Sequence, residues 1–327
     1  MKVLLVSPVF HGYWHAIAAA LAAHGHVVTT HRYDGGDAGR RLRNAVAHRV
    51  PVARPRAARL TTQSAIAALE AVRPDAVLVV KGDVLGSAWW DALTRSRART
   101  ALWLYDELER MNHAPAVLRA VETVYSYSPR DVEALRRAGV PARFLPDGYD
   151  SLTDFRVRPS GAITFVGARY AAREQSLAML AARGIPVAAY GREWSRYPWD
   201  VIRTGRLRSA GVPSHRDLSR AEYYGVMAGS LATLNVHGDG HDGLSMRTFE
   251  ASGVGALQLI DRTDAAEFYE PGRELLVFHS DAELVDHIQR ARRDPVWATG
   301  IRTAGRRRTM ARHTLVHRMG EVQEAWL

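Results

Sequence analysis

The sequence has no cysteine in its 327 residues. This absence excludes disulfide bonds, thiolate catalysis and cysteine-ligated metal sites, and it fits the reducing cytoplasm in which we expect the protein to act. No apolar run approaches the roughly 18 residues that a membrane-spanning helix needs, so we expect a soluble protein with no transmembrane segment. The apolar run at residues 1–6 is too short for a signal peptide and indicates a buried first strand.

Lysine is also nearly absent, so arginine supplies most of the positive charge. The 44 basic and 34 acidic residues give a formal net charge of +10. This balance favours an anionic ligand or partner, such as a nucleotide diphosphate, a nucleic acid or a membrane surface. The 47% of hydrophobic residues and 24% of charged residues are ordinary for a globular protein, and the length allows two domains.

Short apolar runs alternate with helix-forming segments along the whole chain. The strands are expected at residues 3–6, 27–30, 75–80, 100–105, 121–127, 163–166, 187–190, 231–236, 256–260 and 275–278. The helices are expected at residues 15–24, 61–72, 89–97, 129–138, 173–183, 215–227, 244–252 and 281–292, and over most of 295–325. Such alternation predicts parallel strands joined by crossover helices, and hence doubly wound sheets.

A segment that resembles a linker, residues 146–161, separates two such halves. We therefore predict an α/β protein with two Rossmann-like domains, residues 1–150 and 151–307, each with a parallel sheet and facing a common cleft.

The most informative segment runs from residue 231 to residue 259. Its Gly-rich loop, residues 238–243, leaves backbone N–H groups free at the start of the expected helix, which makes it a ready anion site. Arg247 and Glu250 follow one turn apart in that helix. An arginine there can neutralise a phosphate, and a glutamate can accept two hydrogen bonds from a ribose diol.

This segment resembles the donor-binding motif of GT-B glycosyltransferases, and most closely that of the CgeB-like (spore maturation protein) branch. The matching residues are Asn235-Val236-His237, Arg247-Thr248-Phe249-Glu250-Ala251 and Gly255. The spacing from Asp242 to Glu250 also resembles the Glu-x7-Glu motif of retaining GT-B enzymes. The resemblance implies that the first acid, which is an aspartate here, contacts the donor sugar and that the second acid contacts the ribose.

Two further blocks carry the resemblance through residues 160–327. Phe165 to Tyr170, followed by Arg173, resembles the loop whose basic groups hold the diphosphate of the donor, and Tyr190 to Trp194 resembles a Tyr-Gly-x-x-Trp turn. Phe268 to Glu274, followed by Phe278, is also typical of the family. The resemblance implies a donor site that consists of Gly167, Arg169, Arg173, Gly191, Arg192, His237, Gly243, Leu244, Arg247 and Glu250.

The candidates for catalysis in the N-terminal half follow predicted strands. His11 and His15 come after the first strand, where a histidine can act as a general base toward an acceptor hydroxyl. Asp106 ends a later strand and resembles the aspartate that the family carries at this place. Together with Asp242, these are the proposed catalytic residues. The resemblance also implies that a C-terminal helix, about residues 308–327, packs back on the N-terminal domain.

Simpler explanations remain open for several of these residues. Asp242 can instead cap a helix that starts at Leu244, and Arg247 can form a surface ion pair with Glu250 or Glu222. His237 and His241, with Asp239 and Asp242, form an alternative site for a divalent metal. The arginines between Arg302 and Arg318 are either a solvated helix face or a platform for an anionic acceptor.

The sequence therefore predicts a glycosyltransferase that uses a nucleotide-diphosphate sugar of UDP, GDP or dTDP, with no other cofactor and no metal. The acceptor is a small molecule, a glycan or a nucleic acid, and retention of anomeric configuration is favoured over inversion. One alternative is a sugar-nucleotide epimerase or hydrolase with the same fold. The other is an arginine-rich protein that binds or glycosylates nucleic acid.

Overall fold

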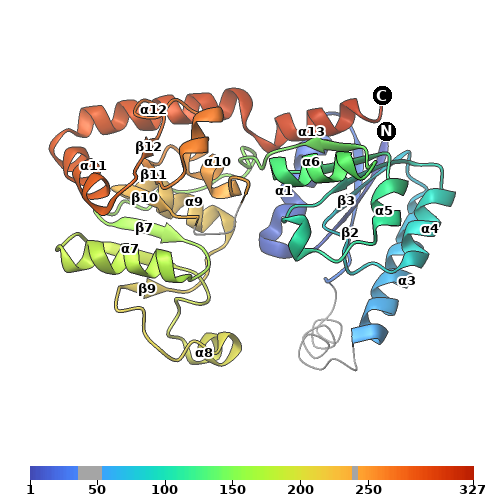
Figure 1. Ribbon diagram of the computed structural model, residues 1–327, viewed down its shortest axis with the longest axis horizontal. Coiled ribbons are helices and arrows are strands. Elements are labelled where there is room, and N and C mark those ends of the chain that lie inside the picture. Colours follow the sequence, from blue (N-terminus) through green and yellow to red (C-terminus); the bar gives the residue numbers. More distant parts are fainter. Residues whose placement is uncertain (36–53, 238–241) are drawn as a thin grey trace. The chain divides into compact units, whose positions relative to one another are not determined.

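The computed structural model describes residues 1–35, 54–237 and 242–327 (Figure 1). The chain divides into two compact units. Met1–Asp147 and Leu315–Leu327 form the first, and Gly148–Thr314 forms the second. Within the described residues, no helix is both long enough and apolar enough to cross a membrane.

The first unit contains a parallel six-stranded sheet in the order β2-β1-β3-β4-β5-β6. Its strands are β1 (Lys2–Ser7), β2 (Val27–Arg32), β3 (Ala76–Val80), β4 (Arg99–Trp103), β5 (Thr123–Ser126) and β6 (Ala142–Phe144). The strands β1 and β3 are almost continuous runs of buried aliphatic residues. Such runs are expected where helices cover both faces of a parallel sheet.

Helices surround this first sheet. They are α1 (Tyr13–Ala23), α3 (Arg54–Val72), α4 (Ser87–Arg95), α5 (Pro115–Ala120), α6 (Pro129–Arg137) and α13 (Leu315–Glu324), with 3₁₀ turns η1 (Phe10–Gly12) and η3 (Leu108–Arg110). The last helix, α13, packs against α1. Arg318 of α13 is buried and donates through Nε to the carbonyls of Pro146 and Asp147, at 2.9 and 3.1 Å.

The second unit repeats this architecture with the order β12-β11-β10-β7-β8-β9, again all parallel. Its strands are β7 (Ile163–Val166), β8 (Val187–Tyr190), β9 (Ser214–His215), β10 (Ala232–Asn235), β11 (Gln258–Ile260) and β12 (Leu276–Val277). Its helices are α7 (Ala171–Ala182), α8 (Pro198–Thr204), α9 (Arg220–Gly229), α10 (Met246–Gly253), α11 (Asp281–Arg293) and α12 (Pro295–Arg312), with the 3₁₀ turn η4 (Thr263–Glu267). The predicted class, two doubly wound parallel sheets, is confirmed.

Some element boundaries differ from the prediction. Residues 215–227 were expected to be one helix, but His215 belongs to β9 and α9 begins at Arg220. The reason is a capping box in which Ser219 and Glu222 bond each other's backbone amides, which starts the helix later. The segment 54–60 was expected to be irregular, yet it forms the first part of α3. The short elements α5, α8 and β6 were not predicted.

Two arginines of α12 form contacts within the fold. Arg302 donates to the carbonyls of Ser230 and Leu231, at 3.0 and 2.6 Å, and burial lowers its pKa. Arg308 pairs with Glu274 at 3.1 Å. These contacts hold α12 against its own unit, so part of the C-terminal positive charge is used within the fold rather than on an open surface.

Candidate functional site

The loops that follow the strands of the second sheet bring the predicted donor residues together. Gly167 follows β7, Gly191 follows β8, and His237 follows β10. In open parallel sheets, ligands bind outside the carboxyl ends of the strands. This end of the sheet is therefore where a ligand of the second unit is expected.

Arg173 lies in the first turn of α7 and is only 6% exposed. It donates through Nε to the carbonyl of Val236 at 2.7 Å and through Nη1 to that of Ala168 at 3.0 Å. Its guanidinium lies over the rings of Tyr170 and Phe165, at 4.5 and 5.2 Å from their centroids. Burial, with a smaller contribution from the nearby charge of Arg247, lowers its pKa to about 10, so it remains protonated at neutral pH.

Arg247 lies in the first turn of α10 and reaches the same place from the other side. Its Nε donates to the carbonyl of Val166 at 2.7 Å, and its guanidinium lies 5.8 Å from the centroid of the Phe165 ring. Among the described residues, neither Arg247 nor Arg173 forms an ion pair with a carboxylate. Two such guanidinium groups side by side, one of them buried, favour an anionic ligand with several oxygen atoms.

Gly167 and Gly191 bring the ends of β7 and β8 close together, and Gly167 also lies against Arg247. A β-carbon on Gly191 would lie 2.5 Å from the carbonyl oxygen of Gly167. That oxygen accepts a hydrogen bond from Trp194 Nε1 at 2.8 Å. Both glycines have positive φ angles, 147° and 150°, that side-chain-bearing residues rarely adopt. The glycines therefore allow the backbone to turn tightly beneath Arg247.

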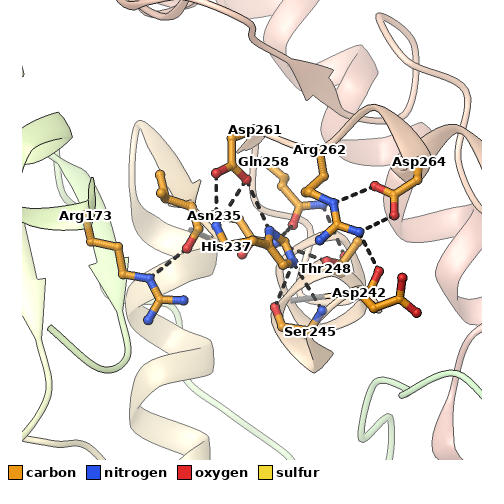
Figure 2. A network of polar contacts seen from close by, with 11 residues as sticks. Arg173, Asn235, His237, Asp242, Ser245, Thr248, Gln258, Asp261, Arg262 and Asp264 are labelled. Carbon is orange, nitrogen blue, oxygen red and sulfur yellow. Dashed lines mark hydrogen bonds and ion pairs between the residues drawn. The ribbon is translucent and has the colours of Figure 1, made fainter. Parts of the chain in front are cut away.

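His237 is 2% exposed and is held at both ring nitrogens (Figure 2). Its Nδ1 lies 3.2 Å from Asp261 Oδ1, and its Nε2 accepts a hydrogen bond from the amide of Ser245 at 3.1 Å. An acceptor at Nε2 requires the neutral tautomer with the proton on Nδ1. Burial lowers the pKa of His237, which keeps the ring neutral. His237 therefore positions the start of α10 rather than carrying a charge.

A buried network of amides ties α10 to the sheet (Figure 2). Asn235 donates through Nδ2 to Thr248 Oγ1 at 3.1 Å and to Gln258 Oε1 at 3.0 Å. Gln258 donates through Nε2 to the carbonyl of Thr248 and to Ser252 Oγ, both at 3.1 Å. Because these partners come from β10, β11 and α10, the network fixes the helix that carries Arg247.

Glu250 bonds to tyrosines of α9, whereas Arg247, in the same helix, bonds to the end of β7. Glu250 is 2% exposed, and its Oε1 accepts hydrogen bonds from Tyr223 at 2.6 Å and from Tyr224 at 3.2 Å. Glu222 instead accepts hydrogen bonds from Ser219 and Arg158. Among the described residues, no ion pair of Arg247 with Glu250 or Glu222 is therefore observed.

Asp242 lies on a half-buried loop before α10. Its carbonyl accepts a hydrogen bond from Arg262 at 2.6 Å, and Arg262 also pairs with Asp264 (Figure 2). The helix begins at Met246, with Ser245 at its N-cap position. Capping of a helix at Leu244 by Asp242 is therefore not observed, since the helix starts two residues later.

The loop before α10, residues 238–244, is described only in part. Gly243 and Leu244 are buried beside this loop, whereas Gly238 to His241 lie outside the described residues. Asp239 and His241, two of the four residues of the alternative metal site, fall in that range. Within the part of the chain that is described, no group of three or more histidine or acidic side chains is placed to hold a metal ion.

Arg169 and Arg192 both have carboxylate partners. Arg169 is buried and binds Glu174 through two hydrogen bonds of 2.9 and 2.7 Å, while Arg192 binds Asp217 at 2.7 Å on the surface. Arg169 also donates through its backbone N–H to Glu193 at 2.7 Å. These arginines have a structural role in the fold, and their contact with a donor stays a prediction.

The predicted catalytic residues of the first unit contact different neighbours. Asp106 accepts a hydrogen bond from Lys81 Nζ at 3.0 Å. His11 and His15 are exposed on η1 and α1, and each ring contacts its preceding neighbour, Phe10 or Trp14. Their roles in catalysis stay predictions.

A search of curated proteins gave no match. Residues 173–324 match the model of a family described as glycosyl transferase-like. The match covers a little less than half of the chain. It includes Arg173 of α7, Arg247 of α10, and His237 and Asp261, which follow β10 and β11.

Solved structures match nearly the whole chain. Anabaena Alr3699/HepE, solved with UDP and glucose, has 14% identity and a TM-score of 0.65 over 99% of this chain and 98% of that one. A sucrose-phosphate synthase from Thermosynechococcus elongatus has 16% identity and a TM-score of 0.65 over 99% and 98%. A DNA modifying enzyme, β-glucosyltransferase, has 11% identity and a TM-score of 0.62 over 100% and 99%. At these identities the likeness establishes the fold, which is GT-B.

Several residues of this GT-B site were not predicted. Asp261 fixes His237, Gln258 and Ser252 complete the amide network, and Tyr223 and Tyr224 hold Glu250. Asp261 follows a predicted strand directly, which is the one sequence signal that could have identified it. The tyrosines come from α9, which is close to α10 only in the folded unit.

Proposed function

We propose that the protein is a glycosyltransferase that transfers a sugar from a nucleotide-diphosphate donor held by the second unit. The observation that supports this most strongly is the pair Arg173 and Arg247, two converging guanidinium groups without carboxylate partners among the described residues. Guanidinium groups bind phosphate oxygens in pairs of hydrogen bonds. The glycosyl transferase-like match over the same residues is in keeping with this assignment.

The chemistry follows from this placement. When the bond from the sugar to the diphosphate breaks, negative charge grows on the leaving diphosphate. Arg173 and Arg247 stabilise that charge because they are already held in place and poorly exposed to water. They supply the positive charge that a divalent metal would otherwise supply, so we propose that transfer needs no metal. On this proposal Glu250 binds the ribose and Asp242 the sugar, as the resemblance to the Glu-x7-Glu motif of retaining GT-B enzymes implies.

The first unit, on this proposal, binds the acceptor, with Asp106, His11 or His15 as its base. UDP, GDP and dTDP sugars all remain candidate donors, and a small molecule, a glycan or a nucleic acid remains a candidate acceptor. Retention of configuration is favoured by the acid spacing from Asp242 to Glu250.

A thermal-shift panel with UDP, GDP, ADP and dTDP tests the donor site. A ligand at 100 times its dissociation constant adds roughly 2.7 kcal/mol to the stability of the folded chain. We expect the nucleotide with one particular base to stabilise the wild type, and Glu250→Gln to lose most of that effect, because glutamine has a single acceptor oxygen and no charge, whereas the carboxylate can offer one oxygen to each ribose hydroxyl. The matched control is Glu222→Gln, which changes a half-buried glutamate bonded to Ser219 and Arg158.

Product analysis distinguishes a glycosyltransferase from a hydrolase and from an epimerase. The substrate is a sugar conjugate of the nucleotide that stabilises the chain in the thermal-shift panel. Transfer to an acceptor supports the proposal. Release of free sugar to water alone would instead identify a hydrolase, and an altered sugar still bound to the nucleotide would identify an epimerase. If none of the nucleotides stabilises a folded chain, the donor-site assignment is wrong.

A further inference from the structure

Helix α8, Pro198–Thr204, buries an aspartate and exposes its two largest apolar side chains. Asp200 is 0% exposed, whereas Trp199 and Ile202 are 60% and 64% exposed. A surface helix normally buries its apolar residues and exposes its charges. The reversed pattern indicates that this helix presents apolar side chains to something other than water.

The buried aspartate fixes α8 in this orientation. Asp200 accepts hydrogen bonds from Ser195 Oγ at 2.8 Å and from Arg216 at 2.7 and 3.2 Å. The guanidinium of Arg216 also lies 4.4 Å from the centroid of the Tyr197 ring. Trp199 and Ile202, three positions apart, therefore project from a helix that is held by charged hydrogen bonds. Figure 1 shows α8 below β9 and apart from the other helices of its unit.

Positive charge surrounds the projecting residues. The exposed arginines of this segment are Arg196, Arg203, Arg206 and Arg208. Between residues 196 and 209 the only acid is the buried Asp200. Two further apolar side chains, Tyr197 and Leu207, are 53% and 87% exposed. We call Tyr197, Trp199, Ile202 and Leu207, with these four arginines, the α8 patch.

We propose that the α8 patch docks the protein on a membrane surface that contains anionic lipids. Tryptophan and tyrosine favour the level of the lipid headgroups, and aliphatic side chains enter the boundary with the acyl chains. Arginines next to them are attracted to anionic headgroups. The combination on one short projecting segment fits peripheral attachment, in which side chains enter the interface and no helix spans it.

Charge and shape disfavour two other partners for the α8 patch, a second copy of this chain and a single-stranded nucleic acid. In a symmetric dimer through this patch, the arginines of one copy would meet those of the other, and like charges across an interface are costly. Single-stranded nucleic acid binds by stacking bases on aromatic rings, and Ile202 and Leu207 offer no ring. The exposed aliphatic residues are explained by a lipid surface.

Vesicle co-sedimentation of the whole chain tests this proposal. We expect binding to vesicles of equal parts phosphatidylcholine and phosphatidylglycerol, little binding to phosphatidylcholine alone, and weaker binding in high salt. Trp199→Ser with Ile202→Ser should lower the partition coefficient at least about tenfold. Arg203→Gln with Arg208→Gln should lower it roughly 25-fold at low salt, about fivefold for each charge.

The matched control is Val296→Ser, which removes an apolar side chain that is 84% exposed on α12 and should leave binding unchanged. Unaltered melting temperatures would show that each variant folds. The proposal is overturned if the wild type does not sediment with anionic vesicles, or if both α8 variants bind as well as the wild type. It is also overturned if the apolar variant loses self-association or oligonucleotide binding while its vesicle binding is unchanged.

Discussion

The guanidinium of Arg247 occupies the space that a β-carbon on Gly167 would need. A β-carbon built there lies 2.7 Å from Nη2 and 2.8 Å from Nη1 of Arg247. The contact joins the end of β7 to the first turn of α10. Arg247 can occupy this position only because glycine has no side chain. Arg247 can lie beside Arg173 because residue 167 is glycine.

Gly167→Ala should therefore displace Arg247 and weaken binding of the nucleotide diphosphate. Loss of one charge-assisted hydrogen bond costs about 1.5–3 kcal/mol, which is roughly tenfold to a hundredfold in the dissociation constant. Titration calorimetry measures the dissociation constant of the nucleotide diphosphate. Gly161→Ala is the control, because a β-carbon at residue 161 meets nothing within 4 Å. Equal affinity of both variants for the nucleotide would contradict this reading of the contact.

Removing Arg247 itself should impair the chemical step as well as binding. Arg247→Ala is expected to lower kcat by about a hundredfold, since the lost charge acts on the leaving diphosphate. Arg273→Ala, which removes an exposed arginine paired with Glu270 at 3.0 Å, should leave kcat unchanged. Steady-state kinetics with saturating donor makes the comparison. A normal kcat in Arg247→Ala would show that this side chain does not stabilise the transition state.

Transfer should continue when divalent metals are removed. The two arginines supply positive charge at the diphosphate, so addition of a chelator should change kcat/KM less than about twofold. The measurement is activity before and after EDTA treatment, followed by addition of Mg²⁺ or Mn²⁺. Loss of activity that a metal restores would contradict the proposed metal independence.

The neutral state of His237 predicts a pH dependence of stability. Burial lowers its pKa and outweighs the hydrogen bond to Asp261, which raises it, while the charges of Arg262 and Arg247 lower it further. The unfolded histidine has a pKa of about 6.5 and takes up a proton more readily than the folded one. The stabilisation is therefore complete above about pH 6.5 and is lost as the pH falls below it.

Melting temperatures of the wild type and of His237→Gln between about pH 8 and pH 5 test this expectation. The stability of the wild type relative to the variant should decrease as the pH falls. A constant difference over the whole range would mean that His237 does not titrate on unfolding in this range.

The amide network beneath α10 should be costly to interrupt. Gln258→Leu leaves the buried partners Asn235, Thr248 and Ser252 without three hydrogen bonds, and we expect a loss of about 3 kcal/mol in the free energy of unfolding. Gln175→Leu, at an exposed position of α7, should change it by less than about 0.5 kcal/mol. Urea unfolding followed by circular dichroism compares the two. A Gln258→Leu protein as stable as the control would show that the network adds nothing.

The alternation of apolar runs and helices was enough to predict both sheets. The buried strands are short runs rich in apolar residues, such as Ala76–Val80, and their periodicity differs from that of the helices around them. Short elements such as α8 escaped prediction because their pattern is reversed, with an aspartate inside and a tryptophan outside. The helix around residues 215–227 was placed too early because the capping box at Ser219 overrides local propensity.

Sequence motifs predicted candidate donor residues better than their supporting contacts. The family resemblance implied Arg173 and His237, and it implied Arg247 together with the place of that residue in the expected helix; the structure brings the three to one end of the second sheet. The sequence could not show that Arg169 binds Glu174 while Arg173 binds only backbone carbonyls and rings. That difference depends on the direction of each side chain in the folded unit.

The most direct test of the central claim compares a nucleoside diphosphate, its monophosphate and the free nucleoside as ligands of the wild type and of Arg173→Ala. The nucleotide base is the one that stabilises the chain in the thermal-shift panel. We predict that the wild type binds the diphosphate at least about tenfold more tightly than the monophosphate, and that Arg173→Ala removes this preference while still binding the nucleoside. Equal affinity of the wild type for all three ligands would contradict the claim that the Arg173 and Arg247 pair holds a diphosphate.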